Sequence, residues 1–321
     1  MIRAGVWAVS VALISLPGGC GGGNSAPAPP EDGGNAKPEF RGFDAMTALG
    51  LLKKQTDFGP RPPKSAAHGQ LKAYLVETLG QWATVTQQDF EQQVNGVTYP
   101  LTNLLGVIPA ATRSSKTAKR SRAGKRLMLA AHWDTRLVAD QDPDPNRRGE
   151  PILGANDGAS GVAVLLEVAR ILSKDKPNVE VVIALFDGED FGDYLYGSTY
   201  FSKHMGDFKP DQAILIDMIG DADLHVQHET NSMNAAPQLF NTVVNAAKEL
   251  GFEDHFDGRE IGIWDDHLPL IRKGIPAIDL IDFDYGPVNS YWHTHEDTVD
   301  KCSAESLRVI GETLLRVVYG M

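Results

Sequence analysis

Apolar residues recur along this chain of 321 residues in two patterns. Spacings of three and four residues, typical of a helix with one buried face, predict helices at residues 43–55, 67–82, 159–172, 237–250 and 303–318. Short runs rich in apolar and β-branched residues predict strands at residues 84–90, 103–109, 126–131, 179–186, 213–216 and 277–281. Because strands alternate with helices, we expect an α/β fold with a largely parallel sheet and helices on both faces.

The first 38 residues differ from the rest. Residues 1–3 are a short basic start, and residues 4–16 are an apolar run that is short for a membrane span and typical of a signal peptide. Leu16-Pro17-Gly18-Gly19-Cys20 resembles a bacterial lipoprotein signal, although Pro17 stands where such signals usually have leucine. We predict a signal peptide over residues 1–19 and a lipid anchor on Cys20. Ordinary cleavage and secretion is the alternative.

Residues 20–38 are rich in Gly, Pro, Ala and Asn and lack large apolar side chains, which predicts a flexible linker. We expect the remaining residues, 39–321, to form one catalytic domain outside the cytoplasm. That domain is periplasmic or secreted, with membrane contact only through lipid at Cys20. The other cysteine, Cys302, then has no partner, which excludes a disulfide-based fold and predicts a packed residue near a helix start.

The formal net charge of -12 argues against a nucleic-acid partner, because phosphates favour a basic face. Residues 112–125 are nevertheless basic, and we interpret them as a solvated hairpin loop between two strands. Residues 137–151 form a long acidic loop, and loops of this kind are often functional. Its alternate Asp residues could hold calcium, but the loop lacks Gly and Glu where a calcium loop has them.

Five residues that can bind a divalent metal follow predicted strands or lie in nearby loops: His132, Asp157, Asp190, Asp217 and His293. Open α/β sheets place their ligands at the carboxyl ends of strands, so we expect these side chains at one edge of the sheet. Each residue alone has an ordinary explanation. Asp157 could cap the next helix, Asp217 could hydrogen-bond a turn, and His293 could be a solvated loop residue.

Glu189 and Asp190 are the strongest local signal of chemistry. They directly follow a buried strand, where two adjacent carboxylates repel unless a cation or a proton relieves them. Asp190 as a metal ligand and Glu189 as a catalytic acid or base is a consistent division. Zinc accepts histidine nitrogen and carboxylate oxygen, and it keeps an open position in catalytic sites.

Several motifs occur in an order that matches one known family. They are Gly154-Ala155-Asn156-Asp157-Gly158-Ala159-Ser160-Gly161, Phe186-Asp187-Gly188-Glu189-Asp190, Leu195-Tyr196-Gly197-Ser198, Ile216-Asp217-Met218-Ile219-Gly220, Asp265-Asp266-His267-Leu268-Pro269 and Trp292-His293-Thr294. Together they resemble the zinc-dependent glutaminyl-peptide cyclotransferases, which share a wider family, peptidase family M28, with zinc aminopeptidases. The resemblance covers residues 43–321 and implies a mixed, mostly parallel central sheet of the zinc exopeptidase type.

The resemblance also implies roles for the site residues. In the cyclases one zinc is held at positions that match Asp157, Asp190 and His293, and the residue that matches Glu189 moves the proton. Asp217 and Asp266 match acidic partners in a hydrogen-bond network. In the aminopeptidases a second zinc uses positions that match His132 and Asp217, so one zinc or two stays open.

The motifs favour cyclisation over hydrolysis. Trp292 precedes the ligand His293, where a flat aromatic wall could hold a glutamine side chain, and Asp265-Asp266-His267 matches the cyclases. Against this, many cyclases have a Trp in a longer loop after the acidic pair, and this chain has none there. We expect Trp264 to replace it and Trp133 to be a core residue.

The predicted function is therefore conversion of N-terminal glutamine in peptides or proteins to pyroglutamate, with ammonia release. The alternative is a zinc aminopeptidase. A third hypothesis, a binding protein with an inactive site, would require loss of Glu189 or of a ligand, and neither is lost.

Overall fold

The computed structural model describes residues 40–111 and 125–321. The chain divides after Pro38, and the described residues all belong to the second unit, Glu39–Met321. The predicted signal peptide (1–19), linker (20–38) and lipid anchor at Cys20 lie outside the described residues, as does most of the basic run at 112–125. They stay predictions, which mass analysis of the mature N-terminus would test.

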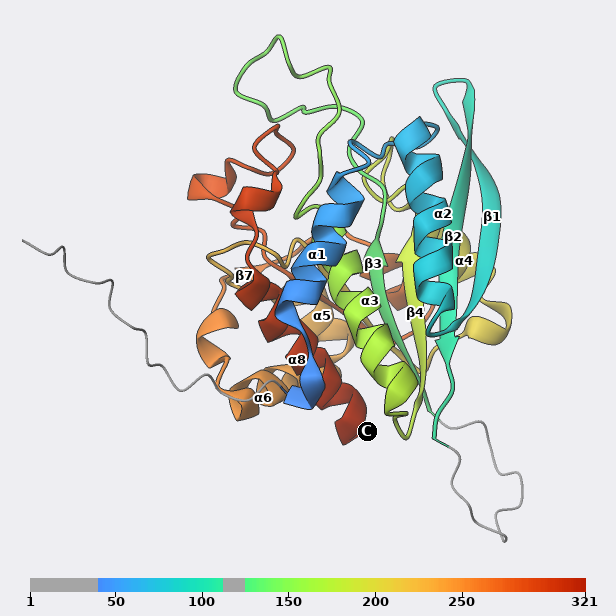
Figure 1. Ribbon diagram of the computed structural model, residues 1–321, viewed down its shortest axis with the longest axis vertical. Helices are drawn as coiled ribbons and strands as arrows, with labels where there is room; N and C mark the ends of the chain where they lie inside the picture. Colours follow the sequence, from blue (N-terminus) through green and yellow to red (C-terminus); the bar gives the residue numbers. More distant parts are fainter. Residues whose placement is uncertain (1–39, 112–124) are drawn as a thin grey trace, which may run out of the picture. The chain divides into compact units, whose positions relative to one another are not determined.

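A six-stranded sheet forms the centre of this unit (Figure 1). Its order is β1 (Thr84–Val94), β2 (Val97–Ile108), β4 (Glu180–Phe186), β3 (Arg126–His132), β5 (Gln212–Asp217) and β8 (Ala277–Ile281). The last four strands are parallel to one another, whereas β2 is antiparallel to both β1 and β4. The mixed, mostly parallel α/β fold is confirmed.

Helices cover both faces of the sheet. The first face carries α1 (Ala45–Thr56), α2 (Ala66–Gly80), α3 (Ala159–Lys174), α6 (Pro237–Leu250) and α8 (Ala304–Gly320). Of these, α1, α3 and α8 pack side by side (Figure 1). The second face carries α4 (Tyr196–Lys203) and α7 (His267–Ile271). None of the helices in the described ranges is both long and apolar enough to cross a membrane.

Alternate residues of β3 divide between the two apolar cores. Leu127 and Leu129 pack in the core under the first helical layer, and Met128 and Ala130 pack in the core under the second. This alternation follows from the two-residue period of a strand. It explains why the predicted strand is apolar throughout, since both of its faces are covered.

The first two strands are longer than predicted and form a hairpin. Asn95 and Gly96, with φ of 49° and 77°, make its two-residue turn. The prediction stopped β1 early at a polar stretch and started β2 late because of Pro100. The first half of β2 pairs only with β1, and an edge position of this kind tolerates proline.

Two further expectations were wrong or incomplete. Residues 112–125 do not connect a hairpin, because β4 lies between β2 and β3 in the sheet. The sequence pattern also missed short elements whose apolar spacing is too brief to register. They are α4, α5 (Thr230–Ala235), α7, β6 (His228–Glu229), β7 (Glu260–Ile261) and the 3-10 helices Phe40–Gly42, Gly206–Phe208, Glu253–His255, Pro287–Asn289 and Val299–Lys301.

Candidate metal centre and active site

Two sets of metal-binding side chains meet at the carboxyl edge of the parallel strands. In the first set, His132 Nε2 lies 3.2 Å from Asp157 Oδ1 and 3.1 Å from Asp217 Oδ1. In the second, His293 Nε2 lies 3.2 Å from Asp190 Oδ1 and 3.6 Å from Asp157 Oδ2. The structure thus brings all five predicted ligands together, and Asp157 presents one oxygen to each set.

Asp157 is held by its loop and does not cap a helix. The N-cap of α3 is Gly158, at φ 95°, and no side chain caps that helix end. A Cβ at Gly158 would lie 2.7 Å from His132 Cε1, so only glycine allows this close approach. The Asp297 carboxylate accepts hydrogen bonds from the backbone N–H of Asn156 and Asp157, which fixes the loop.

A rigid turn after β4 carries Glu189 and Asp190. The backbone N–H of Glu189 donates to Asp134 Oδ1 at 3.0 Å, which ties the turn to the end of β3. Asp187 accepts a hydrogen bond from the backbone N–H of Thr102 at 2.7 Å and lies 2.8 Å from His68 Nε2. Glu189 is therefore positioned by buried contacts from three separate segments of the chain.

Left-handed backbone conformations gather around the site. The ligand His293 has φ 55°, Met218 beside the ligand Asp217 has φ 50°, and Tyr194 and Leu195 have φ 65° and 58°. Such conformations are unfavourable for residues other than glycine and persist where the surroundings enforce them, often at functional sites. Their presence on three loops supports a functional role for this edge of the sheet.

The long acidic loop supports His293. The ring of Trp292 stacks on the His293 ring with centroids 3.8 Å apart, and His293 Nδ1 lies 3.3 Å from Asp140 Oδ1. The backbone N–H of Gln141 donates to the His293 carbonyl oxygen. A carboxylate behind a metal-binding histidine commonly orients its ring, so Asp140 gives the predicted loop a specific role.

Burial and mutual repulsion shift the pKa values of the site strongly. Burial raises the pKa of Glu189 well above its ordinary value; His132 opposes this rise, and the carboxylates of Asp265, Asp190 and Asp266 add to it. Burial also raises the pKa of Asp190 to about 6, with a further contribution from Asp157. Burial opposes the charged form of His293, but nearby carboxylates, Asp190 first, raise its pKa to about 10. A bound cation would relieve this accumulation of negative charge.

The donor atoms fit zinc. Each set offers histidine nitrogen and carboxylate oxygen, with the ligand atoms within 4.8 Å of one another. Asp190 Oδ2 is buried and has no hydrogen-bond partner among the described residues. Buried polar atoms without partners are rare and indicate a missing ligand or ion.

A hollow of about 60 Å³ opens beside both sets, and Glu189 forms part of its wall. Four aromatic side chains contribute to its lining: Tyr194, Trp264, Phe283 and Trp292. Trp264, which is 60% exposed, and Trp292 were expected here. Trp133 is fully buried and stacks on His68 at 4.2 Å, so its assignment to the core is confirmed.

Tyr194 and Arg136 are site residues that the sequence analysis missed. Tyr194 lies in the shortened loop where the missing Trp was noted, and it supplies an aromatic wall after all. The Arg136 guanidinium stacks on its ring at 4.7 Å, and Arg136 Nη1 lies 3.4 Å from Asp190 Oδ1. The sequence feature that could have identified Tyr194 is that it is the only tyrosine between Asp190 and Leu195. No sequence feature pointed to Arg136.

Asp265 and Asp266 follow one another but lie differently. Asp265 lines the hollow, whereas Asp266 is fully buried and neither of its carboxyl oxygens has a hydrogen-bond partner among the described residues. Burial raises the pKa of Asp266 well above its ordinary value, and Asp265 adds to the shift. Asp266 lies close enough to Glu189 for its negative charge to raise the pKa of Glu189.

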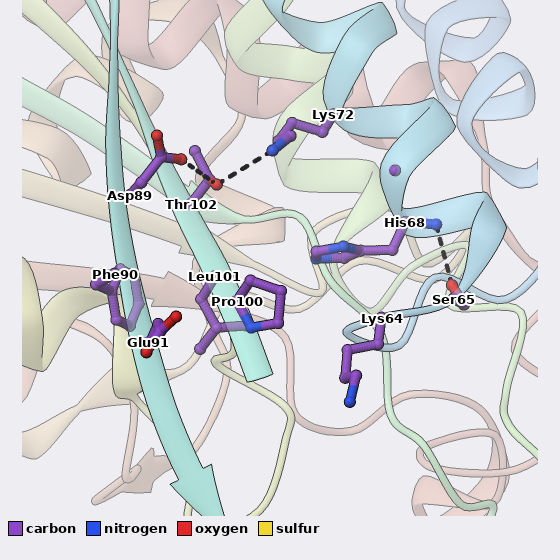
Figure 2. A pocket seen from close by; sticks show the side chains of 11 residues that line it. Lys64, Ser65, His68, Lys72, Asp89, Phe90, Glu91, Pro100, Leu101 and Thr102 are labelled. Atoms are coloured by element: carbon purple, nitrogen blue, oxygen red, sulfur yellow. Dashed lines mark hydrogen bonds between the residues drawn. The ribbon is translucent and has the colours of Figure 1, made fainter. Parts of the chain in front are cut away.

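A larger cavity, about 580 Å³, lies away from the two ligand sets, between α2 and the β1–β2 hairpin. Figure 2 shows His68 and Lys72 of α2 facing Thr102 of β2 across it. None of the five metal-binding residues lines it. Its connection to the site is His68, which contacts Asp187 at the base of the Glu189 turn.

Replacing His68 with alanine should destabilise the protein by roughly 2–3 kcal/mol at pH 8, because it leaves the buried Asp187 carboxylate without one of its partners. Urea unfolding would measure this change. Lys72→Ala is the matched control on the same helix and cavity, and it should cost less than about 1 kcal/mol. Equal effects of the two changes would contradict a supporting role for His68.

Comparisons with known proteins agree with this geometry. The model of Peptidase family M28 matches residues 113–318. The glutaminyl-peptide cyclotransferase of Bos taurus is 26% identical over 230 residues, which cover 59% of this chain and 61% of the bovine protein. The chain spans about two fifths to three fifths of the length of the first two curated relatives it matches. Two other relatives are named probable zinc metalloproteases.

Two solved structures match over 87% of this chain and 98% of their own, each with TM-score 0.79 and 35% identity. One is the glutaminyl cyclase of Bacteroides thetaiotaomicron bound to N-acetylhistamine, and the other is a leucine aminopeptidase precursor from the same species. These two names differ at equal similarity, but other matching structures, from Porphyromonas gingivalis (35% identity, TM-score 0.78) and Tannerella forsythia (33% identity, TM-score 0.79), are named glutaminyl cyclases.

Proposed function

Because the chain belongs to peptidase family M28, we propose that it is a zinc-dependent glutaminyl-peptide cyclotransferase, which converts an N-terminal glutamine to pyroglutamate and releases ammonia. The observation that carries this proposal is the hollow of about 60 Å³ beside the ligand sets. It is small, it is walled by aromatic side chains, and it contains the Glu189 carboxylate.

The hollow suits a glutamine side chain. The flat side-chain amide can lie against the aromatic wall that Trp292 and Phe283 form, where the two rings pack edge to face with centroids 5.0 Å apart. The small volume favours a substrate that folds on itself over a long extended one. A five-membered ring formed within one residue meets that condition.

Asp157, Asp190 and His293 would hold zinc in this proposal, and their shared position at the wall of the hollow supports it. When bound, zinc would supply Lewis-acid polarisation of the side-chain amide carbonyl. Two neighbours contact these ligands: Asp140 Oδ1 lies 3.3 Å from His293 Nδ1, and Arg136 Nη1 lies 3.4 Å from Asp190 Oδ1.

Glu189 would move the proton. The α-amine nitrogen of the substrate forms a bond to the side-chain amide carbon, and the bond from that carbon to the amide nitrogen breaks. Glu189 takes a proton from the amine and gives it to the departing nitrogen, which leaves as ammonia. The raised pKa of Glu189, caused first by burial, suits a group that must both accept and return a proton.

We propose one zinc per chain, since the nucleophile is the substrate's own amine and no second cation is needed to activate water. In this arrangement His132, Asp217 and the buried Asp266 belong to the network around Glu189. His132 Nδ1 lies 4.0 Å from Glu189 Oε2, which supports that assignment.

A second candidate function is supported by one specific observation. His132, Asp157 and Asp217 form a complete second ligand set that shares Asp157 with the first. Paired metal sites of this kind occur in aminopeptidases, where two ions act on the attacking water and the peptide carbonyl. A zinc aminopeptidase is therefore the alternative.

The products of one peptide separate the two functions. Incubation with a peptide that begins with glutamine should release ammonia and lower the peptide mass by that of ammonia, with every peptide bond intact. Mass spectrometry together with an ammonia assay measures both changes. Free glutamine and a peptide shortened by one residue would instead establish the aminopeptidase.

A further inference from the structure

A second hollow lies directly beside the metal centre. Its volume is about 250 Å³. Three segments build its walls: the tip of the β1–β2 hairpin, the loop after β3 and the loop after β4. We call it the hairpin pocket and define it by Val97, Tyr99, Arg136, Leu137, Asp190 and Phe191.

The hairpin pocket adjoins the proposed glutamine site. Asp190 lines both hollows. Tyr194 lines the small hollow and Arg136 lines the hairpin pocket, and these two side chains stack on each other at 4.7 Å. The Arg136–Tyr194 pair therefore lies where the two linings meet, and a chain that leaves the small hollow past this pair reaches the hairpin pocket.

The lining of the hairpin pocket is mainly apolar. Val97 and Leu137 are each 41% exposed, and they are two of the five large apolar side chains that the described part of the chain exposes. Tyr99 and Phe191 add aromatic rings 4.5 Å apart. Exposed apolar side chains gathered on one concave surface indicate a binding site, whereas scattered ones do not.

The charges around the pocket add a preference. Lys64 Nζ lies 5.0 Å from the Tyr99 ring, and Arg136 forms part of the wall. The charge of Arg136 is balanced by Asp140 and Asp190. The positive charge of Lys64 beside the apolar wall therefore disfavours a basic ligand. Arginine has five N–H donors, and Arg136 uses Nε, Nη1 and Nη2 once each toward Asp140 and Asp190. The remaining N–H groups can donate to a peptide carbonyl.

We propose that the hairpin pocket binds the residues that directly follow the N-terminal glutamine, and that it selects peptides with apolar over basic residues there. This inference rests on the proposed function, because it takes the small hollow as the place of the first residue. The occupant follows from the nearness of that hollow, from the apolar lining and from the charge of Lys64.

Three substrates of graded length test the proposal. Glutamine amide fills only the small hollow, Gln-Leu-Leu amide extends beyond it with apolar residues, and Gln-Lys-Lys amide extends with basic residues. The wild-type enzyme should show kcat/KM at least about tenfold higher for the Leu peptide than for the Lys peptide, the usual size of one apolar contact in a specificity pocket. Pyroglutamyl products are measured by mass spectrometry.

Leu137→Asp and Val97→Asp should remove this preference. We expect kcat/KM for Gln-Leu-Leu amide to fall about tenfold, mainly through KM, because the lost contact does not change between ground state and transition state. Turnover of glutamine amide should stay unchanged. Met46→Asp is the matched control, at an apolar residue of α1 that is 68% exposed and outside both hollows. It should leave kcat/KM unchanged for both substrates.

Two results would overturn the proposal. One is an unchanged Leu-to-Lys ratio in both pocket variants. The other is a Leu-to-Lys ratio of kcat/KM that falls to about one in Trp264→Ala but not in the pocket variants. That result would mean that the peptide passes over the exposed Trp264.

A binding measurement separates failure of this proposal from failure of the proposed function. Titration calorimetry with pyroglutamyl-Leu-Leu amide needs no turnover. Weaker binding to Leu137→Asp than to Met46→Asp supports the pocket even if glutamine amide is not cyclised, and equal binding to the two variants argues against it.

Discussion

Replacing Glu189 with glutamine is expected to lower kcat by roughly 10²–10⁴, the usual contribution of a positioned acid–base group. The substitution keeps the size of the side chain and removes its ability to carry the proton. The backbone contact that fixes the turn, from the Glu189 N–H to Asp134, does not involve the changed atoms. Zinc content and the unfolding midpoint should therefore stay close to those of the wild type, and stopped assays with a Gln-initiated peptide measure the loss.

The matched control is Glu180→Gln, at the amino end of the same strand, where Glu180 pairs with Arg126 and does not reach the site. It should leave kcat within about twofold, as expected for a surface substitution away from the chemistry. If Glu189→Gln retained near-normal kcat, Glu189 would be structural, and another group, with Asp265 the nearest candidate in the hollow, would move the proton.

Much of the fold follows from local pattern. The strand that becomes β3 is apolar at every residue from Leu127 to Ala131, and that is the signature of a strand covered on both faces. Strand ends then locate His132 and Asp217, since each is the last residue of its strand. The edge shared by parallel strands brings these two side chains together without further information.

Other parts of the site depend on contacts that no local pattern encodes. His68 and Asp187 are 119 positions apart, yet their contact supports the Glu189 turn. Tyr194 reaches the hollow because its backbone is left-handed, a conformation enforced by the surrounding packing and not by its own preference. Asp140 supports His293 only because the acidic loop folds back over it. Sequence reasoning therefore found the ligands and missed most of the residues that hold them.

We expect the walls of the hollow, together with occupancy of the second ligand set, to decide between cyclisation and hydrolysis. Structures named as a glutaminyl cyclase and as a leucine aminopeptidase precursor are equally similar to this chain, so the shared fold carries no information on the reaction. Tyr194, Phe283 and Trp292 restrict the space beside Glu189. These walls limit the size of the group that can enter. We expect this limit to decide whether the side-chain amide carbonyl or the peptide carbonyl reaches the metal centre.

Removing zinc is expected to abolish activity and to lower the thermal midpoint, by an amount that grows from pH 5 to pH 7.5. In the metal-free protein, burial and Asp157 raise the pKa of Asp190 to about 6, well above the value of roughly 3.9 for an unfolded chain. The folded state then binds more protons than the unfolded state. This contribution to stability is fully present below about pH 4 and is lost as the pH rises through 6. Zinc needs the deprotonated carboxylate, so its own stabilising effect increases over the same range.

Thermal unfolding with and without chelator at several pH values, together with elemental analysis, measures both effects. One zinc per wild-type chain is expected, with almost none in His293→Ala. His295→Ala is the matched control, because His295 lies two positions away and contacts Asp142 outside the ligand sets, so this variant should keep its zinc. Two zinc ions per chain would assign the second to His132, Asp157 and Asp217 and would favour the aminopeptidase. Full activity in protein verified as metal-free would contradict the zinc hypothesis. If the chelator lowered the thermal midpoint by the same amount at every pH, Asp190 would not be a ligand.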